Sequence, residues 1–173
     1  LLGALSCGAR RVYVVDPVDW KREQALTFGA TQAFADIDTA MGAIAELTNG
    51  RMARKVIVTV GRSDGADLEK YMSITSKGGT CVMTAMGGVL DTDVTLNLTL
   101  LALMQKRLQG TIFGGGNPQQ DIPLLLSMYM DGKLRLDDMV TKRYRLDEVN
   151  EGYRDMLEGR NIRGVIRFTD ADW

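Results

Sequence analysis

Short runs of apolar, mostly β-branched residues alternate with longer amphipathic stretches along the first two thirds of the chain. Runs too short for a helix are typical of strands buried on both faces of a parallel sheet. Stretches with apolar residues at near 3.6 spacing, closed by glycine, are typical of helices. We expect strands at 11–15, 32–35, 55–60, 80–84 and 108–113, and helices at 1–7, 19–28, 36–47, 67–75 and 97–106.

This alternation predicts right-handed crossovers between parallel strands, and therefore an α/β fold with a doubly wound parallel sheet. A turn at Lys77-Gly78-Gly79 is expected to separate one of the helices from the strand that follows it. The flexible stretch Gly114–Gly116 predicts a boundary between a domain at 1–113 and a second one at 114–173.

The last part of the chain has a different character. A helix is expected at 121–130, followed by a strand at 140–144 whose alternating side chains suit a sheet with one exposed face. A second helix at 146–157 and a strand at 165–168 complete an α+β pattern. The apolar side of that second helix is expected to consist of Val149, Tyr153, Met156 and Leu157.

Asp16 is the first candidate for chemistry, because it ends the strand at 11–15 and is followed by Pro17. The carboxyl edge of an open α/β sheet is where such folds bind ligands. A carboxylate there suits the two ribose hydroxyls of an adenosine and repels a 2′-phosphate, which favours NAD over NADP. Because proline favours the first helical position and aspartate the position before it, a simple helix cap is an equally consistent interpretation.

Composition removes several classes of function. The chain has 173 residues, 45% hydrophobic and 25% charged, as expected for a globular protein. A net charge of −1 provides no electrostatic attraction to nucleic acid or to an anionic membrane surface. No apolar run approaches the ~20 residues of a transmembrane helix, so we expect neither nucleic acid nor a membrane as partner.

Two cysteines and no histidine restrict the chemistry further. Cys7 and Cys81 lie in apolar surroundings and are expected to be buried thiols in a reducing, cytoplasmic compartment. Without histidine the chain contains neither a Cys/His zinc site nor a histidine general base. The residues themselves therefore indicate no catalytic side chain and no metal ligand.

Other polar positions have two interpretations each. Gly114–Gly116 does not match the spacing of a phosphate-binding loop and is interpreted as a hinge. Lys21 is a candidate for the ribose contacted by Asp16, or a solvated helix lysine. Arg163 is a candidate phosphate contact, or a surface arginine, and the surface interpretation is the stronger one from these residues alone.

Several motifs together give a more specific indication. In order, they are Gly8–Val12 with Val15-Asp16, Phe28–Thr31, Val60–Arg62, Leu108–Gly114, and Val149–Tyr153 with Gly159–Arg163. Over nearly its whole length the sequence resembles the carboxyl-terminal half of zinc-dependent alcohol dehydrogenases of the medium-chain dehydrogenase/reductase family. Within that family it is most similar to the NDMA-dependent, nicotinoprotein-like group of actinobacteria.

The resemblance implies a Rossmann-type NAD site and a role for each of its residues. Asp16 would bind both adenosine ribose hydroxyls, assisted by Lys21, and Arg62 would lie against the adenine. The remaining contacts would be the nicotinamide side, formed by Thr84, Ala85, Met86 and the backbone of Thr111, Ile112 and Phe113, and the pyrophosphate contact of Arg163. Residues 101–113 would supply the edge strand of a homodimer or higher homo-oligomer.

The same resemblance implies what the chain lacks. The family's zinc ligands, its structural zinc lobe and its glycine-rich first βα turn would all precede Leu1, and the first strand of the sheet with them. We therefore expect a truncated dehydrogenase. The full-length parent would use NAD and zinc to interconvert primary alcohols and aldehydes, whereas the 173-residue chain would be inactive by itself.

Three alternatives remain at this point. The first is a zinc-free quinone reductase of the same family. The second is a doubly wound methyltransferase, which would hold the ribose of S-adenosylmethionine with Asp16. The third is a non-catalytic dimerising domain that needs no cofactor.

Overall fold

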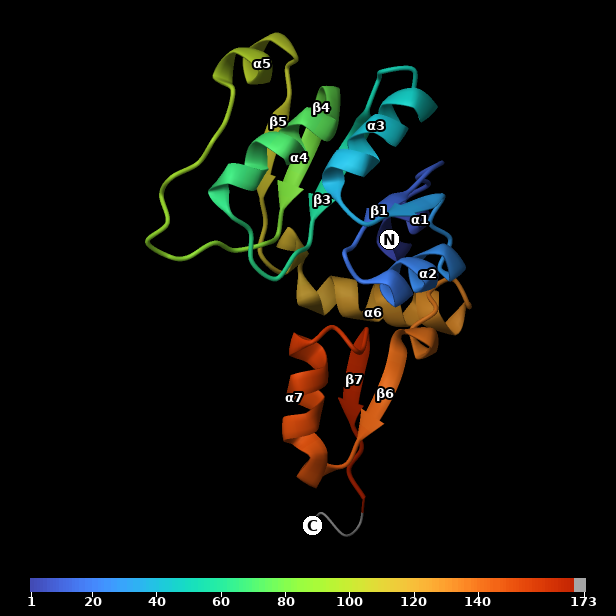
Figure 1. Ribbon diagram of the computed structural model, residues 1–173. Coiled ribbons are helices and arrows are strands. Elements are labelled where there is room, and N and C mark those ends of the chain that lie inside the picture. Colours follow the sequence, from blue (N-terminus) through green and yellow to red (C-terminus); the bar gives the residue numbers. More distant parts are fainter. Residues whose placement is uncertain (170–173) are drawn as a thin grey trace.

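The computed structural model describes residues 1–169, with Phe113 represented by its backbone, and it has the expected alternating architecture (Figure 1). Its first half runs α1 (Leu2–Ser6), β1 (Tyr13–Val15), α2 (Asp19–Thr27), β2 (Gln32–Phe34), α3 (Ile37–Leu47), β3 (Ala53–Val58), a 3₁₀ turn (Gly65–Asp67), α4 (Leu68–Ile74), β4 (Thr75–Met83), α5 (Leu98–Leu103) and β5 (Arg107–Gly110). Strands β1 and β2 form one parallel sheet, and β3, β4 and β5 form a second one in that order.

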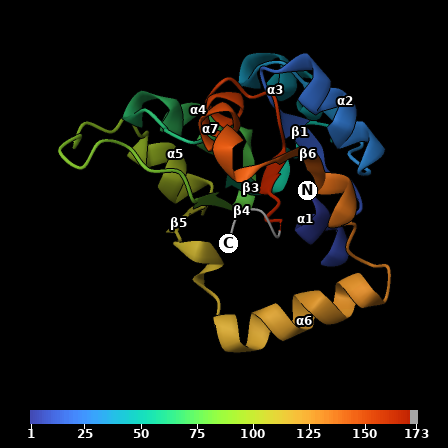
Figure 2. The same ribbon diagram turned by 90° about the horizontal axis from the view of Figure 1, so that it is seen from below.

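The second half begins with a 3₁₀ turn at Phe113–Gly115 and the long helix α6 (Pro118–Met130). It ends with β6 (Val140–Tyr144), α7 (Val149–Leu157) and β7 (Arg163–Ile166), with short 3₁₀ turns at Asp137–Met139 and Leu146–Glu148. Strands β6 and β7 pair in parallel, so these last elements form a small β-α-β layer of their own. Figure 2 shows α6 set to one side of the molecule, away from α2, α3 and α4.

Two apolar clusters hold the first half together. Val58, Leu68, Met72 and Cys81 join one face of the β3-β4-β5 sheet to α4. Ala40, Ile44 and Ile74 join α3 to the end of α4, and partly buried residues of β1, β2 and β3 pack against them. Because these clusters connect the two sheets through α3, burial of apolar surface holds the first half together as one unit.

The expectation that the strands are buried on both faces is wrong for this chain. Val15 is 43% exposed and Ile57 is 55% exposed. The register pairs Ile57 with Val82 and Val82 with Gln109, so these three residues share one face of the sheet. The apolar clusters cover the opposite face, and this one remains open in residues 1–169.

Two local expectations also need correction. Cys7 is exposed, because it follows the short helix α1, which has no buried residue, whereas Cys81 is buried as expected. The turn Lys77-Gly78-Gly79 lies inside β4 as an irregularity, where the register with β3 shifts. Gly78 has a φ of +66°, which permits the chain to deviate there without ending the strand.

The expectation for the apolar side of α7 is wrong, because most of that side faces away from the sheet. Tyr153, Met156 and Leu157 are 61%, 56% and 82% exposed. The face that packs on β6 and β7 carries Gly152 and the buried Asp155 instead. No helix within the described residues is both long and apolar enough to cross a membrane.

Candidate functional site

Asp16 follows β1 at the carboxyl edge of the first sheet, where its backbone N–H donates to the carbonyl of Phe34 at 3.0 Å. Its carboxylate Oδ1 accepts the backbone N–H of Val18 at 2.9 Å. Helix α2 therefore begins at Asp19 with Val18 as its N-cap, two residues later than a cap at Asp16 would place it. Oδ2 takes no hydrogen bond from residues 1–169, so one oxygen of a half-buried carboxylate stays available to a ligand.

Arg22, which the sequence analysis did not single out, completes the turn around Asp16. Its guanidinium donates from Nη1 to the carbonyl of Asp16 at 2.6 Å, and it also pairs with the carboxylate of Asp19. The i,i+3 spacing of Asp19 and Arg22 was a visible signal for this pair. Arg22 thus binds the backbone at the strand end and makes no ion pair with the Asp16 carboxylate.

Three more strand ends meet at the carboxyl edge of the second sheet. Thr84 binds the carbonyl of Val58 with both its backbone N–H, at 3.1 Å, and its hydroxyl, at 3.0 Å. Arg62 and Met86 form a parallel bridge, and the N–H of Thr111 donates to Met83 at 3.0 Å. The structure therefore brings Arg62, Thr84, Ala85, Met86 and Thr111 to one edge, although they come from three strands.

An open groove of about 730 Å³ lies beside this edge. Its volume is within the roughly 300–1,000 Å³ typical of small-molecule sites. It lies on the uncovered sheet face and the turn after β5, and its lining residues are Val82, Gln109, Gly110, Thr111, Ile112, Gly114 and Gly115.

Glycine at 114 and 115 is required by the shape of this groove. Both residues have positive φ, +75° and +66°. A Cβ at Gly115 would lie 3.1 Å from Oγ1 of Thr111, closer than ordinary van der Waals contact. The pair lets the chain turn tightly after β5, so at these two positions the groove is lined by backbone and not by a side chain.

Arg62 is already engaged by another loop of the chain. Its Nη2 atom forms an ion pair of 3.2 Å with the carboxylate of Asp91, and both side chains are largely exposed. Asp91 in turn accepts the N–H of Gly88 at 2.8 Å. The guanidinium therefore lies along the loop at residues 87–97. Local sequence patterns do not predict this contact, because Arg62 and Asp91 lie 29 positions apart.

Lys21 and Arg163 do not contact Asp16. Lys21 lies over the ring of Trp20, with 5.8 Å from Nζ to the ring centroid. Arg163 is exposed at the first position of β7. Strand β7 begins at the end of its layer that is nearest to α2 (Figure 1).

A metal centre is not built by the part of the chain that the structure describes. Residues 1–169 contain no group of three or more histidine, cysteine, aspartate or glutamate side chains arranged to hold a metal ion. Burial raises the pKa of the Cys81 thiol, which favours the neutral form and makes it a core residue rather than a nucleophile. The side chains of the described residues therefore do not fit a zinc ion.

Comparison with known proteins gives a consistent assignment. The family model described as zinc-binding dehydrogenase matches residues 1–130. The chain is 64% identical over 172 residues to alcohol dehydrogenase B of Mycobacterium tuberculosis, with 99% of this chain and 46% of the relative covered. It is 47% identical over 164 residues to the NDMA-dependent alcohol dehydrogenase of Amycolatopsis methanolica, with 95% of this chain and 44% of the relative covered.

Solved structures agree with the sequence relatives. Benzyl alcohol dehydrogenase from Acinetobacter calcoaceticus superposes with a TM-score of 0.88 at 27% identity, covering 98% of this chain and 46% of that one. A zinc-binding-domain alcohol dehydrogenase from Burkholderia ambifaria gives 0.88 at 25% identity, covering 97% and 44%. The chain therefore spans less than half the length of the relatives it matches.

Proposed function

The chain belongs to the zinc-binding dehydrogenase family, and from this premise we propose that it is the NAD-binding and carboxyl-terminal part of an alcohol dehydrogenase. The parent enzyme interconverts primary alcohols and aldehydes. NAD, when bound, supplies the redox chemistry by taking or giving the hydride. The similarity to alcohol dehydrogenases and to an NDMA-dependent enzyme supports this proposal over a methyltransferase or a module without a cofactor.

The observation that carries the proposal is the geometry of Asp16. One carboxylate oxygen is fixed by the Val18 N–H, and the other takes no hydrogen bond from the described residues. A rigid, negatively charged acceptor at the carboxyl edge of a parallel sheet is suited to a pair of ribose hydroxyls and opposes a phosphate. We therefore propose Asp16 as the residue that selects NAD over NADP.

The other residues divide into three groups in this proposal. Lys21 assists at the same ribose, and Arg62 lies along the adenine, with the Asp91 ion pair holding its guanidinium in place. Thr84, Ala85, Met86, Thr111, Ile112 and the backbone of Phe113 face the nicotinamide half. Arg163 contacts the pyrophosphate from β7. The groove beside Thr111 supports the nicotinamide assignment.

Assembly and domain division remain proposals as well. Strand β5 is the outer strand of its sheet, and all four of its residues are exposed. An edge of this kind pairs readily with another strand, which supports a homodimer through residues 101–113. We also propose domains at 1–113 and 114–173, supported by the two left-handed glycines that follow Phe113. A cytoplasmic location stays a prediction, and neither cysteine forms a disulfide.

We propose that the chain by itself binds cofactor without turning over an alcohol, because more than half of each matched relative lies outside the similarity. Zinc, which belongs to the parent in this proposal, is not held by the residues described here. Dehydrogenase activity of the purified chain in zinc-free buffer would contradict this part of the proposal.

Titration with NADH and NADPH tests the cofactor assignment. Trp20 is the reporter, with the other tryptophan replaced by Trp173→Phe, because energy transfer to the reduced nicotinamide quenches its emission. We expect quenching by NADH and not by NADPH. Asp16→Ala should raise the Kd for NADH about 10- to 100-fold, since charged hydrogen bonds are each worth roughly 1.5–3 kcal/mol.

Glu23→Ala is the matched control, because it removes an exposed carboxylate from α2, the helix that follows Asp16. It should leave the Kd for NADH unchanged. Equal binding of NADH and NADPH, or an Asp16→Ala variant that binds NADH as tightly as the parent sequence, would show that Asp16 only shapes the turn.

A further inference from the structure

The turn between α7 and β7, residues 158–162, is fitted onto the first turn of α2. Trp20 donates from Nε1 to the carbonyl of Gly159 at 3.1 Å, across 139 positions of sequence. Gly159 has a φ of +69°, and a Cβ there would lie 3.4 Å from Nζ of Lys21 and 3.5 Å from Cγ2 of Val18. The missing side chain lets the turn approach the segment that holds the Asp16 carboxylate.

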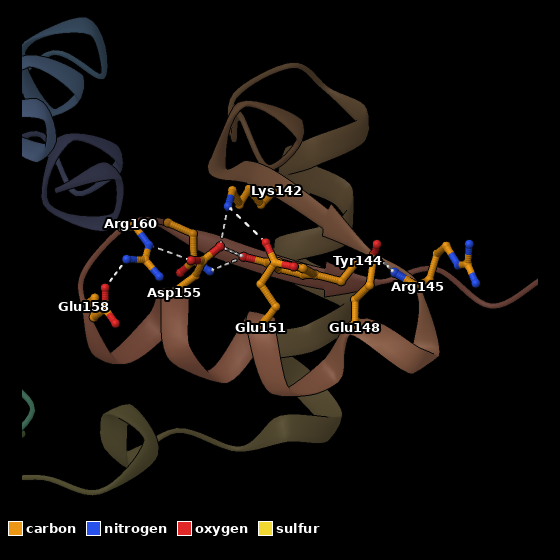
Figure 3. Close-up of polar contacts among 9 residues, drawn as sticks. Lys142, Tyr144, Arg145, Glu148, Glu151, Asp155, Glu158 and Arg160 are labelled. Atoms are coloured by element: carbon orange, nitrogen blue, oxygen red, sulfur yellow. Dashed lines mark hydrogen bonds and ion pairs between the residues drawn. The ribbon is translucent and has the colours of Figure 1, made fainter.

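A buried carboxylate holds this turn in place (Figure 3). Asp155 is 1% exposed, and its Oδ1 accepts from Nε of Arg160 at 2.6 Å. Its Oδ2 accepts from the hydroxyl of Tyr144 at 2.7 Å and from the ammonium of Lys142. The backbone N–H of Arg160 also donates to the carbonyl of Asp155 at 2.8 Å.

These donors come from two different elements. Lys142 and Tyr144 belong to β6, Arg160 belongs to the turn, and Asp155 itself lies on α7. A buried charge is costly unless it is paired and hydrogen-bonded, and a satisfied network of this kind fixes one arrangement of its members. An apolar residue at position 155 would bury area without setting the direction of the turn.

We propose that Asp155 is a positioning residue for the ribose end of the cofactor site. Through Arg160 it sets the Gly159 turn, and through the Trp20 contact that turn sets the first turn of α2. This segment carries Val18, whose N–H holds the Asp16 carboxylate, and Lys21. The inference rests on the proposed function, because it assigns Asp155 to a site defined by NAD binding.

Arg160→Ala is the sharpest test, because it removes the side-chain link between Asp155 and the turn and leaves the contacts of Asp155 with Lys142 and Tyr144 in place. Arg145→Ala is the matched control, since it removes an exposed arginine paired with Asp147 in the same layer. Both are made in the Trp173→Phe background. Without cofactor, Arg160→Ala should shift the emission of Trp20 to longer wavelength, and Arg145→Ala should not.

Cofactor affinity measured by calorimetry gives the second readout. Arg160→Ala should raise the Kd for NADH about tenfold. It should raise the Kd for 5′-AMP, which carries only the adenosine end, by the same factor. Trp20→Phe should weaken binding similarly, and the double variant should bind no more weakly than the weaker single variant, because both substitutions break one path. Arg145→Ala combined with Trp20→Phe should show only the effect of Trp20→Phe.

Each outcome separates the two claims. If the chain without the Arg160 or Trp20 substitution binds no NADH, the proposed function is refuted, and the positioning role with it. If that chain binds NADH, and Arg160→Ala changes neither the Kd nor the Trp20 emission, the positioning role alone is refuted. Additive losses in the Arg160→Ala and Trp20→Phe double variant refute it as well, because they show independent effects. Asp155→Asn, followed by the same two readouts, should reproduce Arg160→Ala if the variant folds.

Discussion

Ile44 and Asp155 are buried almost equally, at 2% and 1% exposed, yet they stabilise their surroundings by different means. Ile44 packs with Ala40 and Ile74 in a cluster that is apolar throughout. Asp155 is surrounded by the polar ends of Lys142, Tyr144 and Arg160. The first half of the chain thus relies on non-directional burial, and the small β6-α7-β7 layer relies on charged hydrogen bonds.

This difference has a consequence for pH. Hydrogen bonds from Lys142, Tyr144 and Arg160 hold the pKa of the Asp155 carboxyl well below its usual range. Burial raises the pKa of Tyr144, and the pairs with Asp155 raise those of Lys142 and Arg160, so these partners stay protonated on acidification. Of these four groups, only Asp155 titrates in acid.

Acid should therefore produce the largest difference between the two parts. The folded-state pKa of Asp155 lies below the unfolded value of about 3.9, so its contribution is fully present above that value. As the pH falls through the folded-state pKa, that contribution is lost. We expect amide protons of β7 to lose protection from hydrogen exchange at a higher pH than those of β4.

Asp155→Asn should abolish this pH-dependent gap, because asparagine does not titrate. Loss of protection at the same pH in both strands of the unsubstituted chain would mean that the two parts unfold as one cooperative unit.

Ile44→Ala should strongly destabilise the apolar part. It deletes a buried side chain, and such changes cost about 2–5 kcal/mol of unfolding free energy. Ile57→Ala removes the same atoms from a position that is 55% exposed, and should cost within roughly 0.5 kcal/mol. Chemical denaturation followed by far-UV circular dichroism measures both, and equal losses would contradict the assignment of the open face.

Alanine in place of glycine should have opposite effects in the two parts. A Cβ at Gly164 would lie 2.8 Å from Cε2 of Tyr144 and 3.0 Å from Nδ2 of Asn161, so overpacking should cost about 1–3 kcal/mol. Gly42 lies inside α3 with no atom within 4 Å of a built Cβ, so Gly42→Ala should stabilise by roughly 0.5–1 kcal/mol. Thermal unfolding compares the pair, and a stabilising Gly164→Ala would show that Tyr144 is loosely packed.

The order of the elements was readable from the sequence because each is encoded locally. The apolar run before Asp16 and the apolar segment before Val60 are strands, and the amphipathic stretch ending at Leu47 is a helix. The resemblance also anticipated the dehydrogenase family, since several short motifs in a fixed order are specific together. Placement of Asp16 at the carboxyl edge followed from the same local pattern.

The packing of α7 was not readable in the same way. Its apolar residues predicted one buried face, whereas Gly152 and Asp155 occupy the packed face. A mid-helix aspartate favours solvent unless partners on other elements satisfy it, and those partners are Lys142 and Tyr144 on β6. The ion pair of Arg62 with Asp91 was not predictable for the same reason, because the contact joins two segments that are distant in sequence.

The sequence by itself determined the alternation of strands and helices, the glycines that end them and the acidic strand end that points to a dinucleotide. Those features depend on neighbouring residues, whose spacing and backbone preferences act within a few positions. Only the tertiary structure decided which sheet face is covered, that Val18 rather than Asp16 is the N-cap of α2, and that Trp20 contacts Gly159. These depend on contacts between residues up to 139 positions apart, which local spacing does not encode.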